Sequence, residues 1–162
     1  MSNETRGGPV KVGTLITGAV IGTMDAQRRI IADVALAIRG DRIIAVGTRQ
    51  EMAGKYQAAE LIDGRGFVIT PGFVDAHIHI TGDPLTRGYV ADDIDDAFGE
   101  KLARWVIPRF LAHSADDEGL SAQLAAVQML RAGTTCFLEA GTIRHLDAVV
   151  AGLSSAGIRG RV

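Results

Sequence analysis

The chain has 162 residues, 47% of them hydrophobic and 22% charged, with a formal net charge of −2. This composition excludes a disordered chain, and the near-neutral charge argues against a protein that binds the phosphate backbone of nucleic acids. A single cysteine excludes an intrachain disulfide and fits a reducing compartment. The sequence shows neither the roughly 20 uninterrupted apolar residues of a membrane helix nor a secretory signal. We therefore expect a cytoplasmic protein with no membrane or nucleic-acid partner.

The N-terminal part has the residue pattern of a β domain. Residues 1–11 are polar and predict a flexible tail. Short β-prone runs then follow one another, separated by turn signals such as Gly40-Asp41. These runs lie at residues 15–20, 34–38, 43–46, 60–62 and 67–70. They predict a small β domain over residues 12–70.

From Phe73 onwards the residue pattern changes and predicts strands that alternate with helices. A strand at residues 73–80 leads into a loop at residues 81–91, and apolar residues then recur at helical spacing as far as His113. We expect Pro108 to interrupt that helix, and we place Trp105 and Phe110 in its core-facing stripe. The elements expected next are a helix from Ser114 with a stripe of Leu120, Leu124, Val127 and Leu130, a strand at 134–140, a helix at 145–156 and a strand from 158. This alternation indicates parallel strands joined by crossover helices.

One segment carries a chemical signal. Strand side chains alternate between faces, so Asp75, His77 and His79 share one face of the strand at residues 73–80. The other face, with Val74, Ala76, Ile78 and Ile80, is aliphatic and suits packing under helices. Two imidazoles two residues apart at the C-terminal end of such a strand can converge on one metal ion. Asp75 sits deeper in the strand and is better read as a hydrogen-bonded residue beneath that ion.

The segment from Pro71 to His79, PGFVDAHIH, resembles the first-strand metal motif of the amidohydrolase superfamily. Further matches resemble its cytosine-deaminase-like and chlorohydrolase branch: Arg87-Gly88, Trp105 with Pro108, MLRAGTT at residues 129–135 and AGIR at residues 156–159. The resemblance implies an α/β chain with a small N-terminal β-sandwich at residues 12–70. Residues 71–162 would then be the first strands and helices of an incomplete (β/α)8 barrel, reaching the start of its third strand.

The resemblance also implies hydrolysis by a metal-activated water, acting on a C–N bond or on a related C–Cl or thiocarbamate leaving group. His77 and His79 would bind a divalent metal. Zinc is the metal expected, with iron, cobalt or manganese as alternatives. The loop between His79 and Arg87 is about one residue longer than usual in this branch, and Glu139 stands where an aspartate is common. Both differences lie at the mouth of the site, so the resemblance does not identify the substrate of this chain.

Three further residues could contact the substrate or support the metal ligands: Glu139, Arg87 and His145. For each of them the residues alone favour a plainer alternative, which is a solvated strand end or local salt bridge for Glu139 and a surface position for Arg87 and His145. The helix that ends at His113 could cover the mouth of the site. No general base is assigned, because the resemblance places the acid/base residues and the other ligands on later strands.

At 162 residues the chain is shorter than a complete (β/α)8 barrel, which takes about 250 residues. We therefore expect the N-terminal portion of a metal-dependent hydrolase that is inactive by itself. The complete enzyme would take a small-molecule substrate and form a homo-oligomer. The alternative is a non-catalytic fragment, or one half of a split enzyme that needs a second chain.

Overall fold

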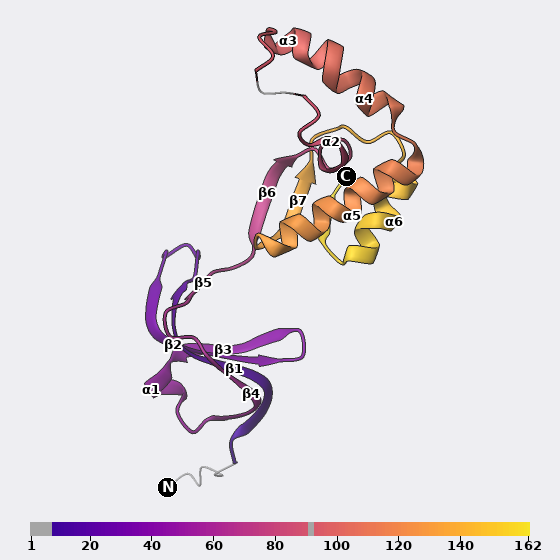
Figure 1. The fold of residues 1–162 in the computed structure, drawn as a ribbon. Coiled ribbons are helices and arrows are strands. Elements are labelled where there is room, and N and C mark those ends of the chain that lie inside the picture. Colours follow the sequence, from indigo (N-terminus) through magenta and orange to yellow (C-terminus); the bar gives the residue numbers. More distant parts are fainter. Residues whose placement is uncertain (1–7, 91–92) are drawn as a thin grey trace, which may run out of the picture. The chain divides into compact units, whose positions relative to one another are not determined.

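The computed structural model describes residues 8–90 and 93–162, and the chain divides into two compact units, Met1–Pro71 and Gly72–Val162 (Figure 1). Strands dominate the first unit, whereas strands and helices alternate in the second, so the chain is of mixed α/β class. Each unit has buried apolar clusters of its own. Within the described residues, no helix combines the length and the apolar character needed to cross a membrane.

The described strands of the first unit form one five-stranded sheet organised around a long first strand. Its elements are β1 (Val10–Gly22), β2 (Ile30–Arg39), β3 (Arg42–Thr48), α1 (Arg49–Met52), β4 (Tyr56–Asp63) and β5 (Val68–Ile69). β1 pairs antiparallel with β2, while β4 and β5 run parallel to its first and second halves. Because the Val10 amide donates to the Lys55 carbonyl, β1 begins inside the predicted tail, of which residues 1–7 lie outside the described residues.

The described residues of the second unit include three parallel strands in the order β6-β7-β8, which confirms the predicted alternation. Its elements are β6 (Phe73–Ile78), α2 (Asp83–Thr86), α3 (Phe98–Lys101), a π-helix η1 (Leu102–Val106), α4 (Ile107–Ala112), α5 (Ala115–Arg131), β7 (Thr134–Glu139), α6 (Leu146–Ala156) and β8 (Arg159–Arg161). Helices α5 and α6 are the crossovers (Figure 1). Gly157 ends α6 in the left-handed conformation, with φ of 74°.

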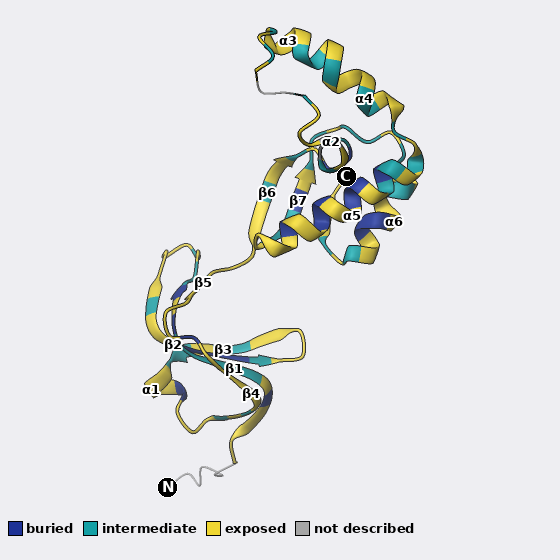
Figure 2. Cartoon of the chain, viewed as in Figure 1, coloured by how far each residue is buried: buried dark blue, intermediate teal, exposed yellow. Residues whose placement is uncertain are grey.

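Helix α5 starts where the sequence predicts but buries a different face. The Ser114 hydroxyl accepts from the Asp117 amide and the Asp117 carboxylate accepts from the Ser114 amide, a reciprocal cap that also lowers the pKa of Asp117. The buried positions are small or polar apart from one methionine, and comprise Glu118, Ser121, Ala122, Ala125, Ala126 and Met129. The predicted leucine stripe is 38–49% exposed (Figure 2). The face with small side chains is the buried one because α5 lies close to α6, where larger side chains would not fit.

The aliphatic face of β6 is covered only towards the end of the strand. Ile80 is fully buried and Ile78 packs against the same core cluster, but Val74 is 70% exposed. The prediction that this whole face packs under helices is therefore wrong for Val74 and for Ala76, which is also exposed. β6 is an edge strand of the described sheet, and its only described strand neighbour is β7.

The helix predicted to end at His113 is interrupted by a wide turn. Its predicted start near residue 92 lies outside the described residues, and the described helical stretch runs from Phe98 to Ala112. In η1 the Ile107 amide donates to the Leu102 carbonyl, five residues back, immediately before Pro108, which has no amide hydrogen to donate. Trp105 and Phe110 are half-buried rather than core residues, and the predicted loop at 81–91 contains α2.

Replacing Gly152 by alanine tests the close packing of α5 and α6. A Cβ at Gly152 would lie 2.5 Å from the Gly119 carbonyl oxygen, whereas one at Gly99 in α3 would meet nothing within 4 Å. We expect Gly152→Ala to lower the free energy of unfolding by about 1–3 kcal/mol, although alanine is the better helix former. Gly99→Ala is the matched control and should not lower it. Equal unfolding midpoints in urea for Gly152→Ala and the wild type would contradict this packing.

Candidate metal and substrate site

The two predicted metal ligands lie together at the C-terminal end of β6. The ring centroids of His77 and His79 are 5.2 Å apart, with their planes at 81°, and both residues are exposed. The Asp75 carboxylate accepts the His77 amide at 3.1 Å, which fixes the backbone below the pair. At the other end of the strand, a Cβ on Gly72 would collide with the Thr135 side chain, so glycine allows β6 to start against β7. The strand thus presents both imidazoles on one side.

Glu139, the last residue of β7, is the carboxylate beside this pair. Its side chain is 2% exposed, so the solvated strand end considered from the sequence is wrong. Oε2 accepts from the Ile80 amide at 2.9 Å, and Oε1 accepts from the amide and hydroxyl of Thr142 at 2.8 and 2.6 Å. Oε1 also lies 3.9 Å from His79 Nδ1. A negative charge at that distance favours the tautomer with its proton on Nδ1, which leaves the Nε2 lone pair for a metal.

A second buried carboxylate organises the loop after β7. Glu118 of α5 is fully buried, and its Oε2 accepts from the amides of Arg144 and His145 at 3.1 and 2.8 Å. These amides lie at the start of α6, where a negative charge is stabilised by the helix dipole. The Arg144 guanidinium donates to the carbonyls of Phe110, Leu111 and His113 at the end of α4. The loop that supplies Thr142 to Glu139 is thereby joined to the helical stretch ending at Ala112.

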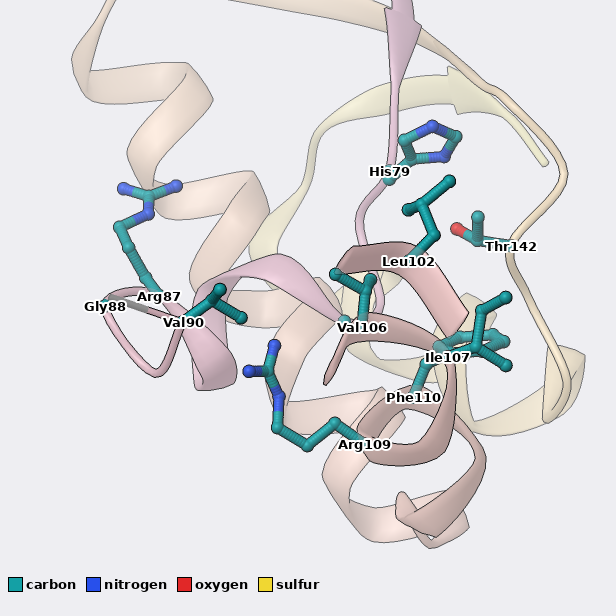
Figure 3. A pocket seen from close by; sticks show the side chains of 11 residues that line it. His79, Arg87, Gly88, Val90, Leu102, Val106, Ile107, Arg109, Phe110 and Thr142 are labelled. Carbon is teal, nitrogen blue, oxygen red and sulfur yellow. The ribbon is translucent and has the colours of Figure 1, made fainter. Parts of the chain in front are cut away.

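A pocket of about 510 Å³ opens beside His79 (Figure 3). Its lining residues are His79, Gly82, Arg87, Gly88, Val90, Leu102, Val106, Ile107, Arg109, Phe110 and Thr142. This volume suits a small molecule. Of the predicted residues, the structure brings His79 and Arg87 to this pocket, while His145 is half-buried at the start of α6 and is not among the described lining residues.

Arg109 is a pocket residue that the sequence did not predict, and Phe110 was predicted to lie in the core. Both belong to α4, directly after Pro108, and both line the pocket. The available signal was Pro108 inside an apolar helical pattern, because a proline there forces a local change of helix type and of the residues that share a face.

The donor set fits part of a metal shell. Within the described residues, no group of three or more His, Cys, Asp or Glu side chains could enclose a metal ion. Two neighbouring imidazoles with a carboxylate behind one of them are nevertheless the ligand and support types found in hydrolytic zinc sites. A complete site would need further ligands from outside the described residues.

Residues 68–160, more than half of the chain, match the model of the amidohydrolase family. The chain belongs to this family. Among curated relatives, this amidohydrolase chain is 35% identical over 151 residues to a 5-methylthioadenosine/S-adenosylhomocysteine deaminase from Nitratidesulfovibrio vulgaris strain DP4. The aligned residues cover 93% of this chain and 33% of the relative. A deaminase of the same name from Clostridium tetani is 32% identical over 127 residues, covering 76% of the chain and 28% of the relative.

Solved structures show the same fold. An adenosine deaminase from Xanthomonas campestris with bound zinc superposes with a TM-score of 0.80 at 24% identity, over 94% of this amidohydrolase chain and 34% of that one. An atrazine chlorohydrolase from Arthrobacter aurescens complexed with zinc gives a TM-score of 0.70 at 23% identity, over 91% and 34%. The chain spans about a third of the length of the curated relatives it matches.

Replacing Glu139 by glutamine tests its role in joining β6 to the loop after β7. The amide group of glutamine must direct a donor at either the Ile80 or the Thr142 amide, so one buried donor loses its partner. We expect a loss of about 1–3 kcal/mol in the free energy of unfolding and faster hydrogen exchange at one of those amides. Glu100→Gln, at an exposed position in α3, is the control. Unchanged exchange at both amides in Glu139→Gln would show that the carboxylate does not hold them.

Proposed function

We propose that this chain supplies the first two ligands, His77 and His79, of a divalent metal in a hydrolase that acts on a C–N bond, most specifically by deamination. The observation that carries the proposal is the pair of adjacent imidazoles at the end of the first parallel strand of an amidohydrolase unit, backed by the buried Glu139. Zinc is the metal we expect. A metal bound there would supply hydroxide at neutral pH by lowering the pKa of its water.

The residues of this chain would perform three tasks. His77 and His79 hold the metal, Glu139 places a carboxylate beside Nδ1 of His79, and the pocket orients the substrate. The apolar walls from Leu102 to Phe110 exclude water from the bound molecule, which strengthens polar interactions inside. A flat heteroaromatic ring with an amino group suits these walls, and the named deaminase relatives act on such a ring. A general base is not assigned to any described residue.

A second candidate is that the chain is one half of a split enzyme, or a non-catalytic fragment. The chain spans about a third of its curated relatives, and the edge of β6 opposite β7 has no described strand partner. An unpaired strand edge of this kind invites pairing with another strand. We also propose that the complete protein is cytoplasmic and forms a homo-oligomer.

Activity measurements test the proposal. We expect ammonia release from 5-methylthioadenosine only when this chain is joined to, or mixed with, polypeptide carrying the later barrel strands. In that form His79→Ala should lower activity by at least about 100-fold, because it removes a metal ligand. The control, His145→Ala, should retain activity within a few-fold.

The two candidates differ in where the later strands reside. Activity in one continuous polypeptide supports the first, activity restored only by mixing two polypeptides supports the split enzyme, and no activity in either supports the inert fragment. Full activity of His79→Ala would refute the metal-ligand assignment.

A further inference from the structure

The pocket beside His79 has apolar walls and an arginine, Arg109, at one end. Five aliphatic or aromatic side chains line it: Val90, Leu102, Val106, Ile107 and Phe110. Two arginines, Arg87 and Arg109, line it as well, and the described lining residues include no aspartate or glutamate. In Figure 3, His79 and Arg109 lie at opposite ends of the lined space. The pocket therefore offers a molecule an apolar middle and two chemically different ends.

Two nitrogens of the Arg109 guanidinium lack a partner among the described residues. Its Nε and Nη1 atoms are buried and have no hydrogen-bond partner within the described part of the chain. The guanidinium carbon lies 4.4 Å from the centroid of the Tyr89 ring. This cation–π contact stabilises the charge, but an aromatic ring face is not a conventional hydrogen-bond acceptor for the N–H groups. Buried charges in proteins are normally paired, so an unpaired guanidinium in a pocket wall calls for an anion.

The local backbone explains how Arg109 reaches this position. Leu102, Val106 and Phe110 are spaced four residues apart, and all three line the pocket. In the wide η1 turn the Ile107 amide donates to the Leu102 carbonyl, so these two pocket residues, five apart in sequence, lie one turn apart on the same side. Arg109 follows Pro108 in the first turn of α4, and its side chain extends across the end of this apolar face.

We propose that this pocket binds an apolar, ring-bearing carboxylate, with the carboxylate against the Arg109 guanidinium and the ring between the walls from Val90 to Phe110. A planar guanidinium matches a carboxylate in shape and charge better than it matches a neutral amide. The further step, that the opposite end of the same molecule is the one presented at His79, rests on the proposed function. Anion binding itself does not.

Binding measurements on the whole chain with a matched pair of probes test this assignment. 3-Phenylpropionate and its neutral amide, 3-phenylpropionamide, share the ring and the linker but differ in charge. We expect the carboxylate to bind at least about tenfold more tightly at low salt, with NMR shifts at Leu102, Val106 and Phe110. Binding is measured with EDTA present, so that neither the metal nor activity enters the result.

Variants assign the preference to Arg109. Arg109→Met should abolish the preference for the carboxylate while the amide still binds, and Arg109→Lys should keep part of it. Without ligand, Arg109→Met should melt at the same or a higher temperature than the wild type, because an unpaired buried charge is gone. Arg104→Met is the control, since Arg104 lies one turn away with its side chain 68% exposed, and it should keep the full preference.

The results separate this inference from the proposed function. Equal affinity of the wild type for both probes, shifts away from the three named residues, or an undiminished preference in a folded Arg109→Met chain would each overturn it. Because EDTA is present in these measurements, the preference does not depend on a metal held by His77 and His79. A preserved preference in a chain that proves to bind no metal would therefore refute only the proposed function.

Discussion

The Glu139 carboxylate satisfies backbone amides at the point where the ladder between β6 and β7 stops. The last paired residues are Ile78 and Glu139, and beyond them Ile80 and Thr81 are fully buried. The Ile80 amide has no ladder partner, and a buried amide without a partner costs about 1–3 kcal/mol. One carboxylate accepts this amide and the Thr142 amide together, and it also lies beside His79. The requirement to satisfy the backbone therefore also positions a negative charge behind the candidate metal ligand.

This arrangement connects the site to the pocket. Thr142 is held by Glu139 and lines the pocket, and the neighbouring Arg144 is bound at its amide by Glu118 and at its guanidinium by carbonyls at the end of α4. The loop between β7 and α6 thus contacts both the strand end that carries the histidines and the helical stretch that carries Arg109. Geometry at His79 and shape at the pocket wall depend on the same few polar contacts.

Local signals in the sequence predicted much of the fold. The Ser114 cap, the Gly157 stop and the alternation of strands and helices are short-range or periodic features, and each is present in the structure. The His77/His79 pair was found for the same reason, since two residues on one strand need no tertiary information to share a face. The face that α5 buries could not be predicted, because its leucine stripe is more hydrophobic than its alanine face and only the close approach of α6 selects the latter. The burial of Glu139 and the placement of Arg109 likewise depend on partners distant in sequence or on a change of helix type.

The central claim is that His77 and His79 bind one metal ion together through Nε2, with the Glu139 carboxylate beside Nδ1 of His79. Long-range ¹H–¹⁵N NMR spectra of the imidazole nitrogens, recorded as Zn²⁺ is added to the chain, test it most directly. The account predicts that the Nε2 signals of both residues change together up to one equivalent of zinc, with Nδ1 protonated, while those of His113 and His145 stay in place. Zinc-induced changes at only one of the pair, or first at His113 or His145, would contradict it.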